Sequence, residues 1–342
     1  METPEYSIVV PVFNEEESIP ALIKVLRDVM ELLDGPAEVV LVDDGSRDSS
    51  YPLMVEANSE DPRFKVIQLS RNFGHQVAIT AGMDAAAGQA VIVMDADLQD
   101  PPHVILEMAA RWQEGYDVVY AVREEREGET LFKRKTASLF YNLLRRLAEI
   151  EQPVDAGDFR LVDRKALDAF LQMRETNRYV RGMFSWIGFR QVAVPYTRAS
   201  RQAGRSKYPL RKMLRLAFDG IIGFSTAPLR LALGTGLVLA VAAVAYGLVA
   251  IALKLAGLPY VPGYASLLVT ITFLSGVQLI VTGMVGQYVG RIYDEARGRP
   301  LYFVRDTHGF TGPGEGNGRA SRPAGTGQSR ASAARVPPRP RA

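Results

Sequence analysis

The chain has 342 residues, contains no cysteine and carries a formal net charge of only +2. This length suits one large domain with an additional part. The absence of cysteine excludes disulfides and thiolate metal sites, and the small net charge gives no indication of a nucleic-acid partner. Three dispersed histidines do not predict a zinc site, and no basic stretch leads into an apolar core near Met1, so no signal peptide is expected.

Apolar runs alternate with helical patterns over residues 6–124. The segments expected to contain strands are 6–16, 37–46, 64–74, 89–100 and 116–124, and the helical segments are 18–34, 75–88 and 103–115. Ser18 is a plausible N-cap for the first helix. Such alternation predicts an α/β fold, with a parallel sheet covered by helices on both faces.

Acidic side chains follow three of the expected strands. Glu15 follows the first strand, Asp43 and Asp44 end the second, and Asp95 and Asp97 end the fourth. Ligands of parallel sheets bind beyond the carboxyl ends of the strands. The topology alone therefore predicts that these acids gather at one site.

The stretch VIVMDADLQDPP places Asp95 and Asp97 one residue apart at the end of a strand expected to be central. Two such carboxylates can converge on Mg²⁺ or Mn²⁺, which prefer oxygen ligands and often bind phosphates as well. Gln99 can supply a neutral oxygen to the same ion. A solvated loop with an Asx turn is the alternative for this short motif.

The stretch LVDDGSRDSS indicates a second contact with a ligand, because Asp43 and Asp44 at a strand end can accept hydrogen bonds from a base or a ribose. A helix N-cap made by Asp44 or Ser46 is the alternative, and both roles can hold together. The phosphate-binding patterns GxGxxG and GxxxxGK[ST] are absent, which disfavours a Rossmann dehydrogenase and a P-loop NTPase.

The C-terminal third contains two long apolar runs, 229–255 and 265–289, joined by a Pro/Gly-rich turn. A membrane span needs about 20 residues, so the runs predict two transmembrane helices, with a buried helical hairpin as the alternative. Basic residues flank the pair on both outer sides, which predicts that the domain 1–228 and the C-terminus are cytoplasmic.

Four further segments complete the organisation. Residues 131–150 and 206–224 have the pattern of amphipathic helices, which lie on the membrane surface or are ordinary surface helices. Residues 291–310 form a cytoplasmic juxtamembrane segment. Residues 311–342 are rich in Gly, Pro, Ser, Ala and Arg and are expected to be a disordered basic tail.

Several blocks of the chain resemble family 2 glycosyltransferases with the Rossmann-like GT-A fold: SIVVPVFNEEESI, VVLVDDGSRDSS, LSRNFGHQVAITAGMDAAAG and VIVMDADLQDPP. Within that family the chain is similar to enzymes that use polyprenyl phosphate, which include bactoprenol glucosyltransferases and dolichol-phosphate mannose synthases. The similarity continues through RQAGRSKYPLRKM and GQYVGRIYDEARGRPLYFV, and GDFRLVDR favours the bactoprenol branch. It ends at about residue 305.

The resemblance implies roles by matched position. The nucleotide would contact Pro11, Asn14, Glu15, Asp43, Asp44 and Asp95, and the metal and diphosphate would be held by Asp95, Asp97 and Gln99. The acceptor phosphate would meet Arg123 and Arg134, and Arg201, Arg205 and Lys207 would lie on a loop that closes over the donor. Asp158 is the candidate base, with Asp155 as its competitor, and Asp158, Asp97 and Arg123 would form the catalytic set.

The implied reaction is an inverting, metal-dependent transfer of a sugar from a nucleotide-sugar to polyprenyl phosphate at the inner membrane. UDP-glucose is the donor favoured by the branch, with aminoarabinose, mannose and N-acetylhexosamine open. A processive polysaccharide synthase is disfavoured because no QxxRW motif is present. A scaffold without turnover is disfavoured by the complete set of acids and arginines. Related enzymes suggest a homo-oligomer, such as a tetramer.

Overall fold

The computed structural model describes residues 3–123, 156–197, 227–256 and 263–310. The first range contains β1 (Tyr6–Val12), α1 (Ile19–Leu32), β2 (Ala37–Asp43), α2 (Ser50–Glu60), β3 (Phe64–Leu69), α3 (His75–Ala85), β4 (Ala90–Val93), α4 (Val104–Gln113) and β5 (Val118–Arg123). All the strands and helices expected there are present, and α2 is an addition. Ser18 occupies the N-cap of α1, but its hydroxyl donates to Glu15 Oε2 at 2.9 Å instead of capping the helix.

The remaining described elements follow in three groups. They are β6 (Ala156–Asp163), α6 (Arg164–Gln172), α7 (Val180–Trp186) and β7 (Gln191–Tyr196), then the long helices α9 (Ala227–Leu255) and α10 (Tyr264–Ala296), and last β8 (Val304–His308). The predicted segments 131–150 and 206–224 and the tail 311–342 lie outside the described residues.

The described strands form one mixed sheet in the order β7-β5-β6-β4-β1-β2-β3-β8. Its centre is parallel, since β1 pairs with both β2 and β4, and β2 pairs with β3. Two strands run against this direction: β6 is antiparallel to β4 and β5, and β8 is antiparallel to β3. β4 is central as predicted, and the sheet is mostly parallel, as the GT-A-like resemblance implies, with β6 inserted between β4 and β5.

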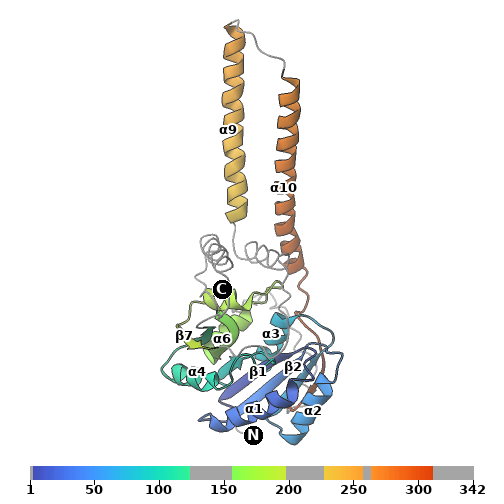
Figure 1. Cartoon of the computed structure of the whole chain (residues 1–342), viewed down its shortest axis with the longest axis vertical. Helices are drawn as coiled ribbons and strands as arrows, with labels where there is room; N and C mark the ends of the chain where they lie inside the picture. The colour runs from blue at the N-terminus through green and yellow to red at the C-terminus, as the bar shows by residue number, and fades with distance from the viewer. Residues whose placement is uncertain (1–2, 124–155, 198–226, 257–262, 311–342) are drawn as a thin grey trace, which may run out of the picture.

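Helices cover both faces of the sheet (Figure 1). Alternate residues of β1 point to opposite faces: Ile8 and Val10 join a buried cluster with α1, α2 and α4, whereas Val9 joins a second cluster with α3, α6 and α7. The two-sided burial explains why the central strands are nearly continuous apolar runs. The acids at their ends are therefore held on a rigid frame.

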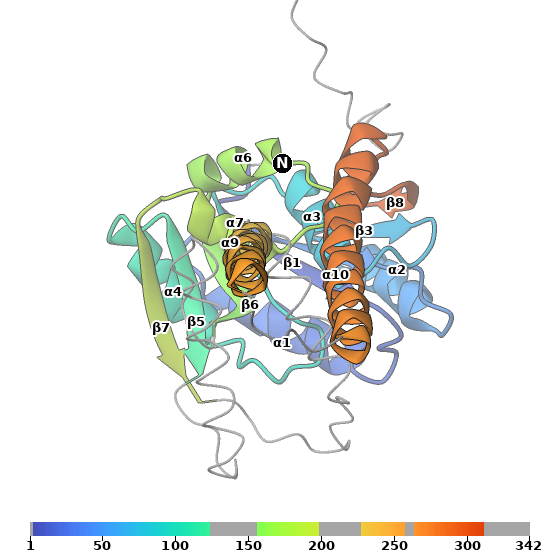
Figure 2. The same ribbon diagram turned by 90° about the horizontal axis from the view of Figure 1, so that it is seen from above.

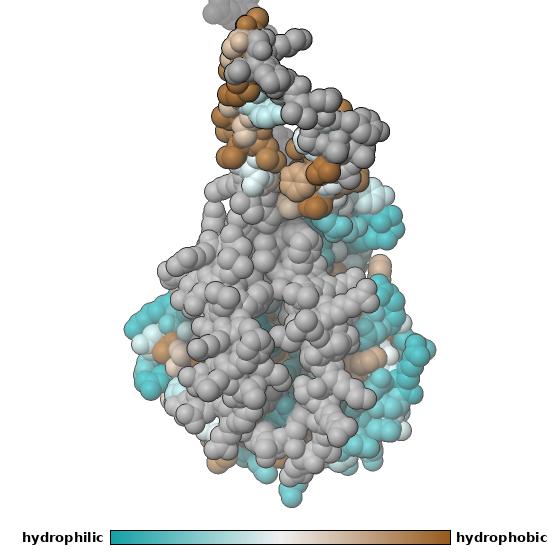
Figure 3. All heavy atoms as spheres, turned by 45° about the horizontal axis from the view of Figure 1, so that its top comes forward, coloured by the Kyte–Doolittle hydropathy of each residue, from teal (hydrophilic) through white to brown (hydrophobic). Residues whose placement is uncertain are grey.

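The helices α9 and α10 extend away from the α/β domain side by side (Figure 1). Both are long and apolar enough to cross a membrane, and no part of the stretches Ala232–Val249 and Val269–Ala296 is buried in the described structure. Leu237 and Val238, for example, are 66% and 67% exposed. Figure 3 shows hydrophobic residues on these helices and hydrophilic ones over the domain below. The protein is membrane-associated, and the structure contradicts a hairpin buried in a soluble core.

After α10 the chain returns to the α/β domain. β8 adds to the edge of the sheet beside β3, with Thr307 opposite Ile67. Thr176 donates its backbone N–H to Glu295 Oε1 at 2.7 Å, and Tyr302 donates its hydroxyl to Asp84 Oδ2 at 2.8 Å. Seen from above, both long helices project over the sheet (Figure 2). The segment 291–310, expected as a juxtamembrane connection, thus contains the end of α10 and the edge strand β8.

Candidate active site

The loop after β1 is hydrogen-bonded to the loop after β2. Asn14, with a positive φ of 56°, receives a hydrogen bond on its side chain from Arg47 N at 2.9 Å and donates its own N–H to Ser46 Oγ at 3.0 Å. Glu15 N donates to Ser50 Oγ at 2.8 Å. Pro11 is buried within β1. Three of the predicted nucleotide-binding residues therefore lie on or beside one strand end.

Asp43 and Asp44 point to different partners. Asp43 accepts from Ser46 N at 2.9 Å and from Gln68 Nε2 at 3.2 Å. Asp44 accepts from the backbone N–H groups of Phe73 at 2.7 Å and Gly74 at 2.9 Å, one on each carboxylate oxygen. Burial raises the pKa of Asp44, although the two backbone donors act in the opposite direction. Asp44 thus fixes the loop that leads into α3.

That loop is packed tightly against the end of β2. Gly45 has a φ of 71°, and a Cβ there would lie 2.7 Å from the carbonyl carbon of Arg71. Only glycine adopts this conformation without strain and also leaves room for the approaching backbone. The first residues of α3 are consequently placed next to the ends of β1 and β2.

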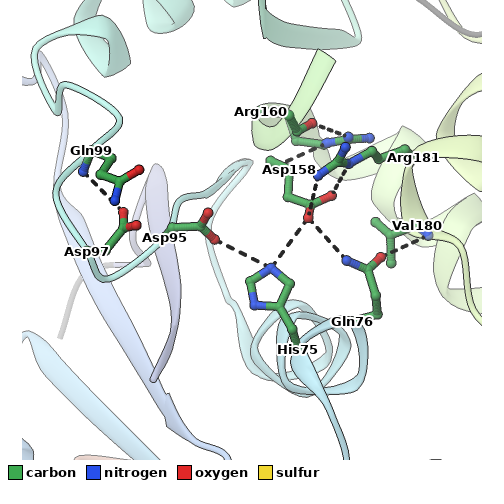
Figure 4. Close-up of polar contacts among 10 residues, drawn as sticks. His75, Gln76, Asp95, Asp97, Gln99, Asp158, Arg160, Val180 and Arg181 are labelled. Atoms are coloured by element: carbon green, nitrogen blue, oxygen red, sulfur yellow. Dashed lines mark hydrogen bonds and ion pairs between the residues drawn. The ribbon is translucent and has the colours of Figure 1, made fainter. Parts of the chain in front are cut away.

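Asp95 and Asp97 lie just beyond β4, on a loop in which Leu98 has a φ of 52°. Asp97 Oδ1 accepts from Gln99 N at 3.1 Å, which is the Asx-turn hydrogen bond considered from the sequence. Asp95 turns the other way, toward His75 and Asp158 (Figure 4). Its Oδ1 is buried and accepts no hydrogen bond. The turn orders the loop without using the Asp95 carboxylate.

Asp158 is buried on β6 at the centre of a polar network (Figure 4). Arg181 of α7 donates Nε to its Oδ1 at 2.8 Å and Nη2 to its Oδ2 at 3.1 Å. Gln76 Nε2 donates to Oδ2 at 3.1 Å, and His75 Nε2 lies 3.4 Å from the same oxygen. Burial alone disfavours the carboxylate, but these donors and charges outweigh it, and the pKa of Asp158 is held well below its usual range.

His75 and Gln76, the first residues of α3, join three elements of the site. His75 Nε2 lies 3.4 Å from Asp95 Oδ1 as well as from Asp158, and Gln76 Oε1 accepts from Val180 N of α7 at 3.1 Å. Burial disfavours the imidazolium, but the neighbouring carboxylates outweigh it and raise the pKa of His75. In contrast, burial raises the pKa of Asp95, and His75 only partly offsets this.

Arg160 lies on β6, and Arg123 ends β5. Arg160 of β6 is buried, donates Nη2 to Gly157 O at 2.8 Å and stacks on Phe184 at 4.9 Å, and burial lowers its pKa to about 10. The backbone of Arg123 ends β5 opposite Tyr196, whose hydroxyl donates to Asp100 Oδ1 at 2.5 Å. The end of β5 therefore lies beside the loop of Asp95 and Asp97. The described residues do not include Arg134, Asp155, Arg201, Arg205, Lys207 or the side chain of Arg123.

Comparison with known proteins identifies the family. The model named Glycosyl transferase family 2 matches residues 7–171. The uncharacterized glycosyltransferase YkcC of Bacillus subtilis (strain 168) is 50% identical over 306 residues, which cover 90% of this chain and 95% of that protein. The chain belongs to glycosyltransferase family 2. This family 2 glycosyltransferase is also 42% identical over 302 residues to the SfII prophage-derived bactoprenol glucosyl transferase of Shigella flexneri, covering 88% of this chain and 98% of that one.

One of the solved structures that are similar to this chain is a mannosyltransferase. The mannosyltransferase PcManGT from Pyrobaculum calidifontis, in complex with GDP-Man and Mn²⁺, is 21% identical, with a TM-score of 0.43 over 86% of this chain and 88% of that one. The mixed α/β sheet of this glycosyltransferase is the GT-A-like fold expected from the sequence. The chain is an enzyme of glycosyl transfer.

The residues of this glycosyltransferase fit a divalent cation that is shared with a ligand. No group of three or more His, Asp or Glu side chains in the described ranges is arranged to hold a metal by itself. Asp95 nevertheless has a buried oxygen without a hydrogen bond, and Asp97 and Gln99 follow it on the same loop. Hard cations bound through one or two carboxylates complete their shell with phosphate oxygens and water. The donor set therefore suits Mg²⁺ or Mn²⁺ together with a diphosphate.

Sequence reasoning missed His75, Gln76, Arg160 and Arg181. His75 and Gln76 lie within the block LSRNFGHQVAITAG, so their place at the start of the helix that follows a strand was a usable signal. Arg181 offered no such signal, because it reaches the site only through the packing of α7 against β6.

Proposed function

We propose that this glycosyltransferase transfers glucose from UDP-glucose to polyprenyl phosphate at the cytoplasmic face of the inner membrane, with Mg²⁺ or Mn²⁺ as cofactor. The proposal rests on one observation above all: 42% identity over 88% of the chain to a protein named bactoprenol glucosyl transferase. The placement of an acidic site on a domain that bears two exposed apolar helices agrees with a lipid acceptor.

The reaction is a single displacement. An oxygen of the acceptor phosphate attacks the anomeric carbon, the bond from that carbon to the diphosphate breaks, and a nucleoside diphosphate leaves with the bonding electron pair. When bound, the divalent ion neutralises charge on the leaving diphosphate. Asp95, Asp97 and Gln99 hold the ion, while Pro11, Asn14, Glu15, Asp43 and Asp44 line or shape the nucleotide side. The sugar configuration inverts at the anomeric carbon.

Charge rather than basicity limits this reaction. The second pKa of a phosphate monoester is about 6, so the acceptor is mainly a dianion at neutral pH and needs little help in losing a proton. It must instead approach an anionic donor. Cationic side chains that bind the acceptor, with Arg123 and Arg134 as candidates, lower this barrier through charge-assisted hydrogen bonds.

The membrane arrangement follows from the helices. We place α9 and α10 across the bilayer as a hairpin, with the α/β domain and the C-terminus in the cytoplasm. Because β8 follows α10 and pairs with β3, both ends of the hairpin are joined to the same domain, as this orientation requires. Domain limits of 1–228 and 229–290, and a homo-oligomer such as a tetramer, remain predictions.

The decisive experiment measures transfer of radiolabelled sugar from nucleotide-sugars into organic-extractable lipid phosphate. With purified protein and undecaprenyl phosphate, UDP-glucose is expected to label the lipid with Mg²⁺ or Mn²⁺ present, and EDTA is expected to abolish labelling. Asp97→Ala is expected to reduce the rate at least about 100-fold, as is typical when electrostatic stabilisation of a transition state is lost. Lys24→Ala, a change on the outer side of α1, is the control.

Other donors in the same assay separate the alternatives. Labelling from UDP-aminoarabinose, GDP-mannose or a UDP-N-acetylhexosamine, and none from UDP-glucose, would show that the transferred sugar is not glucose. The enzyme would still belong to the class that transfers a sugar to polyprenyl phosphate. A polymer product would indicate a processive synthase. No lipid-linked product with any donor would overturn the proposal.

A further inference from the structure

The site brings several anions together, and only some of its described cations can reach a ligand. Asp95, Asp97 and Asp158 all belong to the candidate active site (Figure 4), where the proposed function brings a diphosphate donor and a phosphate acceptor together. Arg160 is turned inward: its residue exposure is 3% and its described hydrogen bonds go to backbone oxygens. Arg181 differs, because its side chain contacts Asp158 and is still 38% exposed.

The guanidinium of Arg181 binds Asp158 along one edge, and its other edge is not used for a hydrogen bond or ion pair within the described residues. Its Nε and Nη2 bind the two oxygens of Asp158 at 2.8 and 3.1 Å. Its Nη1 makes no hydrogen bond or ion pair with any other residue of the described ranges. A planar guanidinium held along one edge presents its remaining N–H groups in a fixed direction, which suits recognition of a phosphate.

Arg181 also lies on the part of the domain that is tied to the membrane helix. It is the second residue of α7, and the segment before α7 is joined to α10 through the hydrogen bonds of Thr176 to Glu295 at 2.7 and 3.3 Å. Glu295 is in the last turn of α10. The phosphate of a polyprenyl lipid resides at the membrane surface, next to the end of such a helix.

Both carboxylate oxygens of Asp158 accept hydrogen bonds from neighbouring side chains. One oxygen accepts from Arg181, and the other accepts from Arg181 and Gln76 and lies 3.4 Å from His75 Nε2. A base must instead have a lone pair directed at the proton that it removes. The same contacts are those expected of a side chain that fixes the direction of an arginine.

We propose that Arg181 binds the acceptor phosphate and that Asp158 is the positioning residue that aims it, not the base. The inference rests on the proposed function for its choice of acceptor. Gln76 supports the same arrangement, because it bridges Asp158 and the first residue of α7, Val180. The low pKa of Asp158 agrees with a carboxylate that stays ionised throughout the reaction.

A purely architectural ion pair between α7 and β6 is the competing explanation. The chain offers a matched control for it, since Arg174 makes a two-point ion pair with Asp84 at 2.7 and 2.8 Å and has a side chain 39% exposed. Arg174→Gln breaks a pair of the same kind away from Asp158. Any effect of Arg181→Gln that Arg174→Gln lacks is therefore specific to the site.

The test measures acceptor and donor separately. In detergent-solubilised full-length protein, Arg181→Gln is expected to raise the KM for undecaprenyl phosphate at least about 10-fold, consistent with loss of a charged hydrogen bond, and Arg181→Lys less. The dissociation constant for UDP-glucose, measured by calorimetry without acceptor, is expected to stay within about 2-fold. Arg174→Gln should leave both values unchanged. Equal acceptor KM values for Arg181→Gln and Arg174→Gln would overturn the inference.

Asp158→Asn distinguishes positioning from base catalysis. A positioning role predicts a raised acceptor KM and a kcat–pH profile of unchanged shape. Loss of the acidic limb of that profile with an unchanged KM would show that Asp158 is the base and contradict the inference. If the wild-type enzyme transfers no sugar, the proposed function fails. In that case, calorimetric binding of a short-chain prenyl phosphate to wild type but not to Arg181→Gln would still support the phosphate contact. No difference in that binding would overturn it.

Discussion

At Asp158, burial and electrostatic pairing act in opposite directions on one carboxyl group. Burial penalises the charge, whereas Arg181, His75 and Gln76 stabilise it, and the result is a pKa far below the ordinary value of 3.8. A carboxyl whose folded pKa is depressed stabilises the fold above its unfolded pKa and loses that contribution as the pH falls toward the folded pKa. The network is therefore a stabilising element at neutral pH.

This predicts a pH-dependent cost for Asp158→Asn. At pH 7 the variant leaves Arg181 without its charged partner, and we expect a loss of about 1–3 kcal/mol in the free energy of unfolding. The difference from wild type should grow as the pH falls from about 8 to 5, because Asp158 also raises the pKa of His75. It should shrink below about pH 4, since unfolded aspartate titrates near 3.9. Denaturant unfolding followed by near-UV circular dichroism measures it. A difference that keeps growing below about pH 4 would contradict the assigned pairing.

Residues at strand ends could be predicted from the sequence, and residues that arrive by packing could not. Asp44, Asp95 and Asp97 follow apolar runs, so the topology of a parallel sheet places them together before any coordinates are known. Arg181 lies on a seven-residue helix whose partner strand, β6, is antiparallel and inserted between β4 and β5. No local pattern reports such a contact. In the structure the Asp44 carboxylate binds the loop before α3, and its contact with the nucleotide stays a prediction.

At the scale of single elements, α3 is the helix that brings His75 and Gln76 to the site, and its distance from the sheet is set by small residues. Ala78, Ala81 and Gly82 are buried against β1 and β2. The alanine- and glycine-rich pattern was sufficient to predict the helix. In contrast, α2 buries only Ser50, Met54 and Ala57, and its weak apolar stripe explains why it was not predicted.

Gly82→Ala tests how closely α3 must approach the sheet. A Cβ at this position would lie 2.3 Å from Val9 Cγ1 and 3.0 Å from Val42 Cγ2, and neither β-branched neighbour can rotate away freely. We expect the free energy of unfolding to fall by about 1–3 kcal/mol, as for other overpacked cores. Gly236→Ala in α9 is the control, because nothing lies within 4 Å of its added Cβ. Unchanged thermal stability of Gly82→Ala would contradict the close packing.

For Gly82→Ala we also expect reduced transfer activity, because a helix displaced from the sheet moves its first turn. His75 and Gln76 would then lose their hydrogen-bonding distances to Asp158. The activity loss should exceed that of a variant destabilised equally elsewhere, for which Arg174→Gln serves as reference.

At the scale of the whole molecule, the long apolar helices α9 and α10 interrupt the α/β domain rather than follow it. The first elements of the sheet lie before α9, yet β8 lies after α10 and pairs with β3. The sequence predicted the two apolar helices from length and composition alone. It did not predict β8, because a five-residue strand that pairs more than 200 residues away carries no local pattern that requires the pairing.

The segment after α10 contacts a loop of the candidate active site. Phe303 O accepts from Ser70 N at 2.9 Å, and the Phe303 ring lies 6.5 Å from that of Phe73, in the loop that Asp44 binds. Contacts made after α10 therefore support the loop before α3. In the proposed membrane arrangement, a hairpin joined to the domain at both ends would hold the site more firmly than a single connection would.

Truncation at two points tests this coupling. Ending the chain at Leu301 removes β8 with Tyr302 and Phe303, whereas ending it at Phe310 removes only residues 311–342. We expect the shorter chain to lose about 3–5 kcal/mol of stability, from two aromatic side chains and the strand hydrogen bonds. Both tryptophans, Trp112 and Trp186, lie in the α/β domain, so intrinsic fluorescence reports its unfolding without a signal from α9 or α10.

The same pair of truncations connects stability with function. The loop of Phe73 and Gly74 loses its contact with Phe303 only in the shorter chain. Sugar transfer should therefore fall in that chain and persist in the chain that ends at Phe310. Measured well below the melting temperature of either chain, such a difference comes from displaced site residues and not from unfolding. Equal melting temperatures and equal transfer rates for the two truncations would show that β8 is dispensable and that the hairpin acts only as an anchor.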